Sequence, residues 1–185
     1  MDLYFFGGSF DPPHLGHKEI INHFIDKSDI LIVCPSYKSP LKDAKPIASF
    51  LQRKEMLEMM FLNNKKLSII DHEIHNKITY TIDTIKHLKC IYSNYQIHLI
   101  IGADQFNKFH LWKDYENILN KVTLQVVSRP GDQIIDNNIS FNHTKLINVD
   151  ASSSFIRKNI FHLNEISGML DQSVLKYINS KGLYN

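Results

Sequence analysis

The sequence predicts a doubly wound parallel α/β sheet. Short apolar runs alternate with amphipathic helical patterns, and several of these runs are apolar throughout instead of alternating with polar residues. Strands of that kind are typical of a parallel sheet that helices cover on both faces. The length of 185 residues is enough for one sizeable core, so we expect a single domain over residues 1–185.

Taken in chain order, the strands are expected where apolar residues run together, and the helices where they recur every three or four positions. The expected strands are Leu3–Phe6, Asp29–Cys34, Lys66–Ile70, Tyr95–Gly102, Val122–Ser128 and Lys145–Val149. Crossover helices are expected between them, with shorter helices in the second half of the chain. The expected helices are His14–Lys27, Phe50–Leu62, Thr81–Ile91, Asp104–Trp112, Tyr115–Leu119, Ser153–Asn159 and Gln172–Ser180. Residues Pro35–Pro46 form the longest expected loop, and "DHEIH" (Asp71–His75) is interpreted as a solvated loop.

The composition excludes several classes of protein. A net charge of +2 is too small to indicate a nucleic-acid partner, although a local basic pocket could still bind a small anion. No apolar stretch approaches the roughly 20 residues of a membrane span, and the first residues do not resemble a signal peptide. We therefore expect a cytoplasmic protein without a membrane partner, and the sequence leaves a homo-oligomer open. Cys34 and Cys90 are expected to be buried free thiols.

The segment "GGSFDPPHLGH" (Gly7–His17) joins the first strand to the first helix. Gly7 and Gly8 allow a ligand to approach the main chain, and their amide groups can point at it. The helix begins near His14, so its partial positive charge faces the same space, and His17 lies on the same side of the first turn. Backbone donors and two imidazoles at one point predict a polyphosphate site in which growing negative charge is stabilised.

Other interpretations of this segment are weaker but remain open. No Gly-Lys-Ser/Thr follows, as a Walker loop requires, and the full Gly-x-Gly-x-x-Gly dinucleotide pattern is absent. Asp11, His14 and His17 could together bind a metal ion. By spacing alone, the two histidines could also be structural.

Two further segments are candidates for ligand binding. In "SSSFIR", Ser152 is a candidate N-cap, which places Ser153, Ser154 and Arg157 in a first turn that could bind an anion or simply be a capped helix. Gly102 and Asp104 end the fourth strand near the expected switch point of the sheet. Asp104 could accept a hydrogen bond from a ribose hydroxyl, help to place a hydrated metal, or cap the helix that follows.

Seven segments, in order and over nearly the whole chain, resemble the motifs of the bacterial nicotinate-nucleotide adenylyltransferases, which are nucleotidyltransferases with a His-x-Gly-His-type signature. These segments are "GGSFDPPHLGH", "PLK" (Pro40–Lys42), "QRKEML" (Gln52–Leu57), "TYTIDTI" (Thr79–Ile85), "IIGADQFNKFHLW" (Ile100–Trp112), "SRPG" (Ser128–Gly131) and "SSSFIR" (Ser152–Arg157). This chain has Leu41 where the family usually has His, Ser154 where it has Thr, and no glycine in "HNKI" (His75–Ile78).

The resemblance implies a Rossmann-like nucleotidyltransferase fold and transfer of the adenylyl group of ATP to nicotinic acid mononucleotide, with Mg²⁺ held mainly through the ATP phosphates and no metal site of the protein's own. It implies that His14 and His17 are catalytic. The ATP-binding residues that it implies are Gly7, Gly8, Ser9, Phe10, His14, His17, Gly102, Asp104, Ser153, Ser154 and Arg157. The acceptor-binding residues that it implies are Lys42, Thr79, Tyr80, Thr81, Asp83, Trp112 and Arg129. Alternative acceptors are nicotinamide mononucleotide and phosphopantetheine, and an alternative of another class is a non-catalytic nucleotide-binding regulator.

Overall fold

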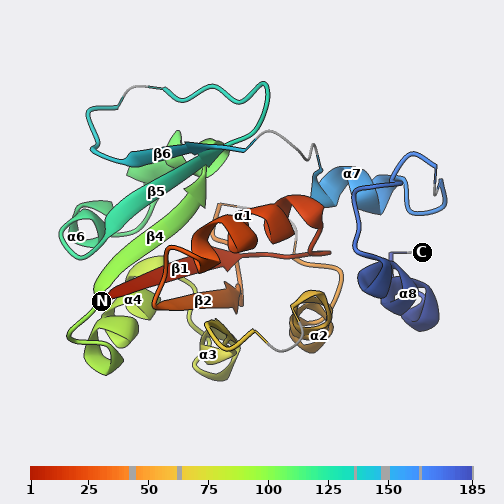
Figure 1. Ribbon diagram of the computed structural model, residues 1–185, viewed down its shortest axis with the longest axis horizontal. Coiled ribbons are helices and arrows are strands. Elements are labelled where there is room, and N and C mark those ends of the chain that lie inside the picture. Colours follow the sequence, from red (N-terminus) through yellow and green to blue (C-terminus); the bar gives the residue numbers. More distant parts are fainter. Residues whose placement is uncertain (42–44, 62–63, 136, 147–150, 163, 185) are drawn as a thin grey trace.

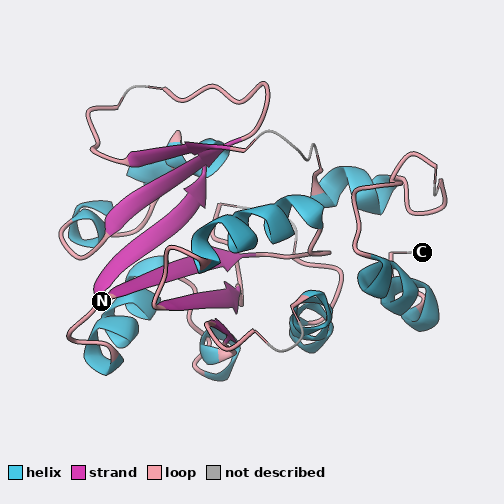
Figure 2. Cartoon of the chain, viewed as in Figure 1, coloured by secondary structure: helices cyan, strands magenta, loops and turns pink. Residues whose placement is uncertain are grey.

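The centre of the molecule is a six-stranded sheet in the order β3-β2-β1-β4-β5-β6, and each pair of neighbouring strands is parallel. In this computed structural model the described residues are 1–185 except 42–44, 62–63, 136, 147–150, 163 and 185. Helices lie on both faces of the sheet (Figures 1 and 2). The predicted doubly wound parallel fold is therefore confirmed.

The strands are β1 (Asp2–Gly8), β2 (Ile30–Pro35), β3 (Leu67–Ile69), β4 (Gln96–Gly102), β5 (Thr123–Ser128) and β6 (Asn142–Lys145). The helices of the first half are α1 (Leu15–Ile25), α2 (Phe50–Met60), α3 (His72–His75) and α4 (Thr81–Ile91). The second half contains α5 (Ala103–Phe106), the 3₁₀ helix η1 (Phe109–Leu111), α6 (Tyr115–Leu119), α7 (Ser153–Lys158) and α8 (Gln172–Lys181).

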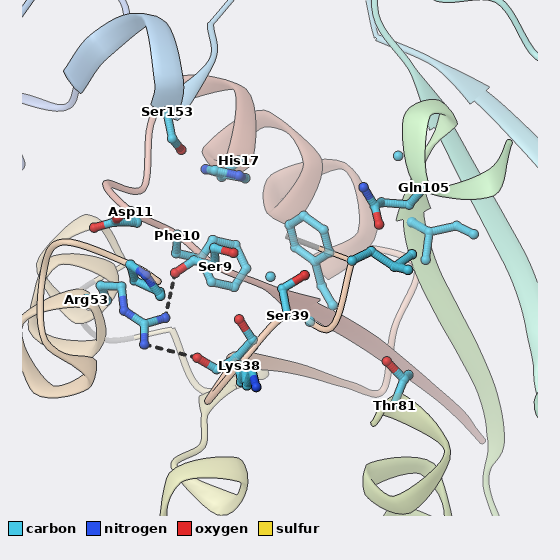
Figure 3. Close-up of a pocket in the computed structure, with 18 of the residues that line it drawn as sticks. Ser9, Phe10, Asp11, His17, Lys38, Ser39, Arg53, Thr81, Gln105 and Ser153 are labelled. Atoms are coloured by element: carbon cyan, nitrogen blue, oxygen red, sulfur yellow. Dashed lines mark hydrogen bonds between the residues drawn. The ribbon is translucent and has the colours of Figure 1, made fainter. Parts of the chain in front are cut away.

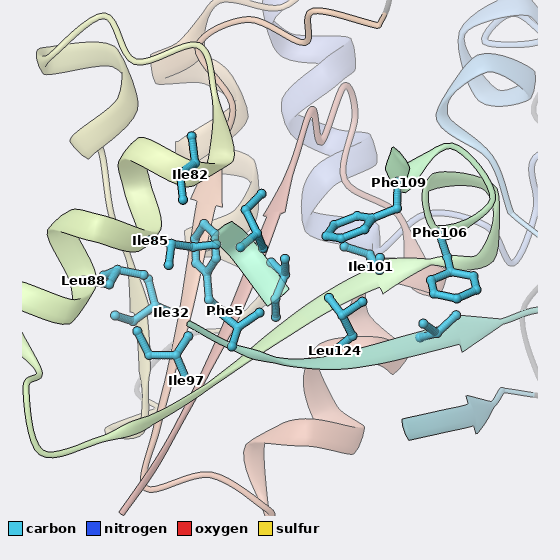
Figure 4. Packing of buried hydrophobic residues seen from close by; sticks show 14 of the residues in the cluster. Phe5, Ile32, Ile82, Ile85, Leu88, Ile97, Ile101, Phe106, Phe109 and Leu124 are labelled. Carbon is cyan, nitrogen blue, oxygen red and sulfur yellow. The ribbon is translucent and has the colours of Figure 1, made fainter. Parts of the chain in front are cut away.

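The central strand β1 shows why both faces of the sheet are apolar. Leu3 and Phe5 point into one cluster, which α4 completes on its side of the sheet (Figure 4). Tyr4 and Phe6 point to the opposite face, where the buried side chains of α1 cover them. Because successive side chains of a strand point to opposite faces, a strand that is apolar throughout must be covered twice.

A third apolar cluster joins the C-terminal part of the chain to α2. Met56 of α2 packs with Ile156 of α7 and with Val174 and Ile178 of α8, all of them buried. In Figure 1, α7 and α8 lie beyond one end of the strands instead of over a face of the sheet. This packing holds the start of α7 close to the loop between β1 and α1.

The order of the strands determines where a ligand can bind. From β1 the chain passes to β2 and β3 on one side, and it then returns through α4 to β4 on the other side of β1. The carboxyl ends of β1 and β4 therefore flank the switch point of the sheet. In open α/β sheets, ligands bind in the crevice at such a point.

Two of the expected elements differ in the structure. The last strand is β6 instead of Lys145–Val149, of which residues 147–149 lie outside the described part of the chain. β6 is an edge strand of the described sheet and pairs with β5, so its "NHTK" sequence can stay largely exposed without an apolar pattern. The expected helix Asp104–Trp112 is divided into α5 and η1. Asn107 is the C-cap of α5, and its side chain bonds the backbone of Gln133 and Ile135.

Two further expectations were wrong. Residues His72–His75 form the short helix α3 instead of a solvated loop, and Glu73 within it is buried. Cys34 is a buried free thiol, but Cys90 is free and exposed because it lies in the last turn of α4 beside the exposed Ile91. Within the described ranges, none of the helices combines the length and the apolar character that crossing a membrane would require.

Candidate active site

A large cavity lies at the carboxyl ends of β1 and β4, at the predicted switch point. Its volume is about 1320 Å³, and the starts of α1, α4 and α7 all contribute to its wall. Sites for one drug-sized ligand typically measure about 300–1,000 Å³. The cavity is therefore large enough for two ligands of nucleotide size.

His14 and His17 form one stacked pair in this wall. His14 is the N-cap residue of α1, and its ring centroid lies 3.7 Å from that of His17, with 25° between the ring planes. The backbone N–H of His14 donates to Nδ1 of His17 at 3.2 Å, which orients the second ring. The sequence prediction that both imidazoles meet in the first turn is confirmed.

His14 is held in its neutral form. His14 is only 4% exposed, and burial together with the nearby positive charge of Arg129 lowers the pKa of His14 to about 3. Its Nδ1 atom is buried without a hydrogen-bond partner among the described residues. An anion in the cavity would favour the protonated ring and would raise this pKa.

The loop from β1 to α1 is shaped by a close approach between Gly8 and Phe10. A Cβ atom at Gly8 would lie 3.0 Å from the Phe10 ring, which in turn packs edge-on against His17 at a centroid distance of 4.9 Å. Phe10 is buried and has a φ of 49°, a left-handed conformation that is unfavourable for a bulky residue. The surrounding packing therefore maintains a strained loop against the histidine pair.

The start of α7 forms the wall beside the histidines (Figure 3). Ser152 is its N-cap, as predicted, and its side chain accepts a hydrogen bond from the N–H of Phe155 at 3.1 Å. The hydroxyl of Ser153 donates to the carbonyl of Pro12 at 2.9 Å. Nη1 of Arg157 donates to the carbonyl of Asp11 at 2.6 Å. Ser153, Ser154 and Arg157 all line the cavity, so two loops distant in sequence are joined at the site.

The carboxylate of Asp11 is used to hold the loops together. Asp11 is 3% exposed, and it accepts hydrogen bonds from the backbone N–H groups of Ile47 and Ala48 at 2.8 and 3.0 Å. The hydroxyl of Tyr184 also donates to it at 2.8 Å. Because these donors occupy its carboxylate, Asp11 is poorly suited to bind a metal ion together with His14 and His17. In the part of the chain that the structure describes, no group of three metal-binding side chains occurs.

Gly102 and Asp104 line the cavity at the end of β4. The N-cap of α5 is Gly102, so Asp104 lies in the first turn and is not itself the cap. A Cβ atom at Gly102 would lie 2.6 Å from Oδ1 of Asp104. The absence of a side chain at Gly102 thus leaves room for the carboxylate.

The start of α4 forms another part of the wall. Thr79, Tyr80 and Thr81 line the cavity there, and Figure 3 shows Thr81 across the pocket from Ser153. Trp112 lines the cavity and also packs against the core, with its ring centroid 5.1 Å from that of Phe109.

The remaining candidates fall into three groups. Gly7, Ser9 and Arg129 line the cavity, and Nη1 of Arg129 donates to the carbonyl of Ala151 at 2.7 Å. Asp83 lies further along α4 and does not line the cavity. Lys42 lies outside the described residues, although its neighbour Leu41 is part of the wall.

Two buried charged residues support the site, and neither role is predicted from the sequence. Nη1 and Nη2 of Arg53 donate to the carbonyls of Ser9 and Ser36 at 2.6 and 3.0 Å, which joins the loops that follow β1 and β2 (Figure 3). Glu73 accepts hydrogen bonds from the N–H of Tyr37 and the hydroxyl of Thr84, and burial raises the pKa of its carboxyl. Arg53 belongs to the "QRKEML" segment, whereas nothing in "DHEIH" indicates that its glutamate is buried.

Known proteins resemble this chain over most of its length. A family model described as cytidylyltransferase-like matches residues 5–159. A protein of Flavobacterium psychrophilum named "Probable nicotinate-nucleotide adenylyltransferase" is 34% identical, and the match covers 98% of this chain and 97% of the relative. A protein of Campylobacter jejuni with the same name is 35% identical over 96% of each chain.

A solved structure shares the fold. The nicotinic acid mononucleotide adenylyltransferase of Plasmodium falciparum, complexed with NaAD, aligns with a TM-score of 0.83 at 22% identity. The alignment covers 99% of this chain and 97% of that chain. The chain belongs to the cytidylyltransferase-like family and, within it, to the group of relatives named nicotinate-nucleotide adenylyltransferases.

Proposed function

We propose that the protein transfers the adenylyl group of ATP to nicotinic acid mononucleotide, with nicotinic acid adenine dinucleotide and pyrophosphate as products. One observation carries this proposal: a single cavity joins the stacked His14–His17 pair to the start of α4 and to Trp112. The first group suits a triphosphate, and the second suits an aromatic acceptor. The names of the relatives that match over nearly their full length support the same reaction.

In this reaction an oxygen of the acceptor's 5′-phosphate attacks the α-phosphorus of ATP. The bond from the α-phosphorus to the bridging oxygen breaks, and pyrophosphate leaves with that electron pair. The attacking phosphate is already an anion, so no base must remove a proton from it. The protein therefore needs to align the two nucleotides and to stabilise the charge that grows on the phosphates.

His14 and His17 are the groups that we assign to charge stabilisation. Both lie at the positive end of α1, where an α-phosphate would also meet the backbone amides that follow Gly8. Arg157, together with the hydroxyls of Ser153 and Ser154, would hold the outer phosphates.

The donor set of the cavity fits a magnesium ion that enters with ATP. Magnesium commonly binds one or two carboxylates together with substrate phosphates, and it keeps several water molecules. Asp104 is a carboxylate in the wall that could hold such a hydrated ion. The bound ion would neutralise charge on the phosphate oxygens.

The start of α4 would recognise the acceptor. Thr79, Tyr80 and Thr81 present the amide end of the helix to the cavity, and Trp112 offers a ring on which a pyridine can stack. Amide donors at a helix start favour a carboxylate over a carboxamide, because the amide's own NH₂ group would face them. The acid mononucleotide is therefore the expected acceptor.

A cytoplasmic location stays a prediction from the sequence.

Pyrophosphate release from ATP tests the proposal, with the acid and amide mononucleotides supplied separately. We expect kcat/KM to be higher for the acid by about tenfold to a hundredfold, the usual effect of an unpaired polar group in a closed site. Equal values or a preference for the amide would contradict the assigned acceptor. No pyrophosphate with either mononucleotide or with phosphopantetheine would support the non-catalytic alternative.

A further inference from the structure

A lysine and an aromatic ring meet on the wall of the cavity beside the start of α4. The ring belongs to Tyr80, which is the N-cap residue of α4, and the lysine is Lys113, which directly follows Trp112. The ammonium nitrogen of Lys113 lies 4.3 Å from the centroid of the Tyr80 ring, a favourable cation–π distance. Both residues line the cavity.

This contact adds a positive charge to the part of the cavity wall that the N-cap residue of α4 also lines. Tyr80 is the N-cap residue of α4, so the ammonium lies over the ring of the residue that precedes the first turn of the helix. None of the ion pairs found among the described residues involves Lys113. A ring face attracts a cation but does not neutralise it, so the charge remains available to an anionic ligand.

We propose that Lys113 determines specificity for the acid mononucleotide, and this inference rests on the proposed function. A pyridine ring stacked on Trp112 would extend its substituent toward the start of α4, between the helix amides and the ammonium. A carboxylate there gains a charge-assisted hydrogen bond with Lys113. A carboxamide gains less, because it carries no charge and its NH₂ group is itself a donor.

The Tyr80 ring acts as the positioning partner of Lys113. A lysine side chain has four rotatable bonds and loses considerable rotamer entropy when it is held in one place. Contact with the ring lowers that cost before the acceptor binds. Removing the ring should therefore weaken the contribution of Lys113 without changing its charge.

The test compares the parent with Lys113→Gln, using kcat/KM for each mononucleotide at saturating ATP. We expect the value for the acid to fall about fivefold, as for the loss of one well-placed but solvent-exposed ion pair, while the value for the amide changes little. Lys113→Arg should retain most of the preference. Lys108→Gln is the matched control, because Lys108 lies in the same segment but does not line the cavity.

The salt dependence provides a second readout. Because ions screen an exposed charge pair, the acid-to-amide ratio of the parent should fall as ionic strength rises, and that of Lys113→Gln should fall less. Tyr80→Phe keeps the ring face, so its acid-to-amide ratio should match that of the parent. In Tyr80→Leu the ratio should drop, and adding Lys113→Gln to it should cost less than in the parent.

Other outcomes would overturn the inference. An unchanged ratio in Lys113→Gln would remove Lys113 from specificity, and an equal fall for both mononucleotides would assign it to their common phosphate. A parent that uses both mononucleotides equally would overturn the inference but leave adenylyl transfer standing. A parent that uses neither would overturn both the inference and the proposed function.

Discussion

The imidazole rings of His14 and His17 stack at 3.7 Å, and the backbone N–H of the first donates to Nδ1 of the second. One histidine therefore orients the other through the first turn of α1. Two protonated rings at this distance would repel each other, so the pair favours at most one positive charge in the free protein. The low pKa of His14 assigns the neutral form to the buried ring.

Replacing His17 by Ala should slow turnover much more than it weakens ATP binding. In our proposal His17 contacts the phosphate that is transferred, and losing one such donor typically costs on the order of a hundredfold in rate. The measurement is kcat together with the Kd for ATP. His23→Ala is the control, since His23 lies on the same helix but does not line the cavity. Near-normal turnover would exclude His17 from catalysis.

Arg157→Lys should raise the KM for ATP although the charge is kept. The guanidinium already donates through Nη1 to the carbonyl of Asp11, and its planar fork can reach a phosphate at the same time. A lysine cannot offer parallel donors in this way. Steady-state kinetics with ATP as the varied substrate measure the effect, with Lys158→Arg as the control on the same helix. ATP kinetics equal to those of the parent would be the contrary result.

The pKa of His14 predicts how stability depends on pH. Since its pKa is about 3 in the folded protein and about 6.5 in an unfolded chain, the unfolded state binds one more proton between these values. Titration of His14 therefore does not lower the free energy of unfolding above pH of about 6.5. As the pH falls from there toward 3, it lowers this free energy by up to about 1.4 kcal/mol per pH unit.

Denaturant unfolding of the parent and of His14→Gln at several pH values measures this contribution. Below pH of about 6.5, the free energy of unfolding of the variant should decrease less steeply than that of the parent. The difference in slope should be about 1.4 kcal/mol per pH unit, which corresponds to one proton. Parallel curves would mean that His14 titrates alike in both states. In the folded parent, adding ATP should raise the pKa of His14, which an NMR titration of its ring would detect.

Gly102→Ala should impair ATP use through Asp104. The new Cβ atom would lie 2.6 Å from Oδ1 of Asp104, so the carboxylate must turn away. If Asp104 contacts ATP or its hydrated ion, kcat/KM for ATP should fall on the order of tenfold, which is the effect of losing one hydrogen bond to a charged group. Asp104→Ala alone and the double variant complete a cycle. A double variant much worse than Asp104→Ala would show that Gly102 acts independently.

The regular elements around the switch point could be predicted from the sequence because their signals are local. β1 is a continuous apolar run, α4 has helical periodicity, and the capping role of Ser152 depends on a hydrogen bond within one turn. The polar edge strand β6 has no such signal, since its place follows from pairing with β5. Prediction therefore failed where a neighbouring segment decides the structure.

The same reason explains which site residues were missed. The burial of Glu73 depends on donors from Tyr37 and Thr84, which the sequence does not place nearby. Arg53 reaches the carbonyls of Ser9 and Ser36 across two loops. Such contacts exist only after the strands have set the loops side by side.

The hydrogen bond from Tyr184 to Asp11 has a consequence for the time at which the site is completed. Asp11 and Tyr184 lie 173 positions apart in the sequence. Contacts between such distant residues carry a large loop-closure cost and form late in folding. We therefore expect a folding chain to pair its central strands first and to complete the Asp11 part of the cavity wall late.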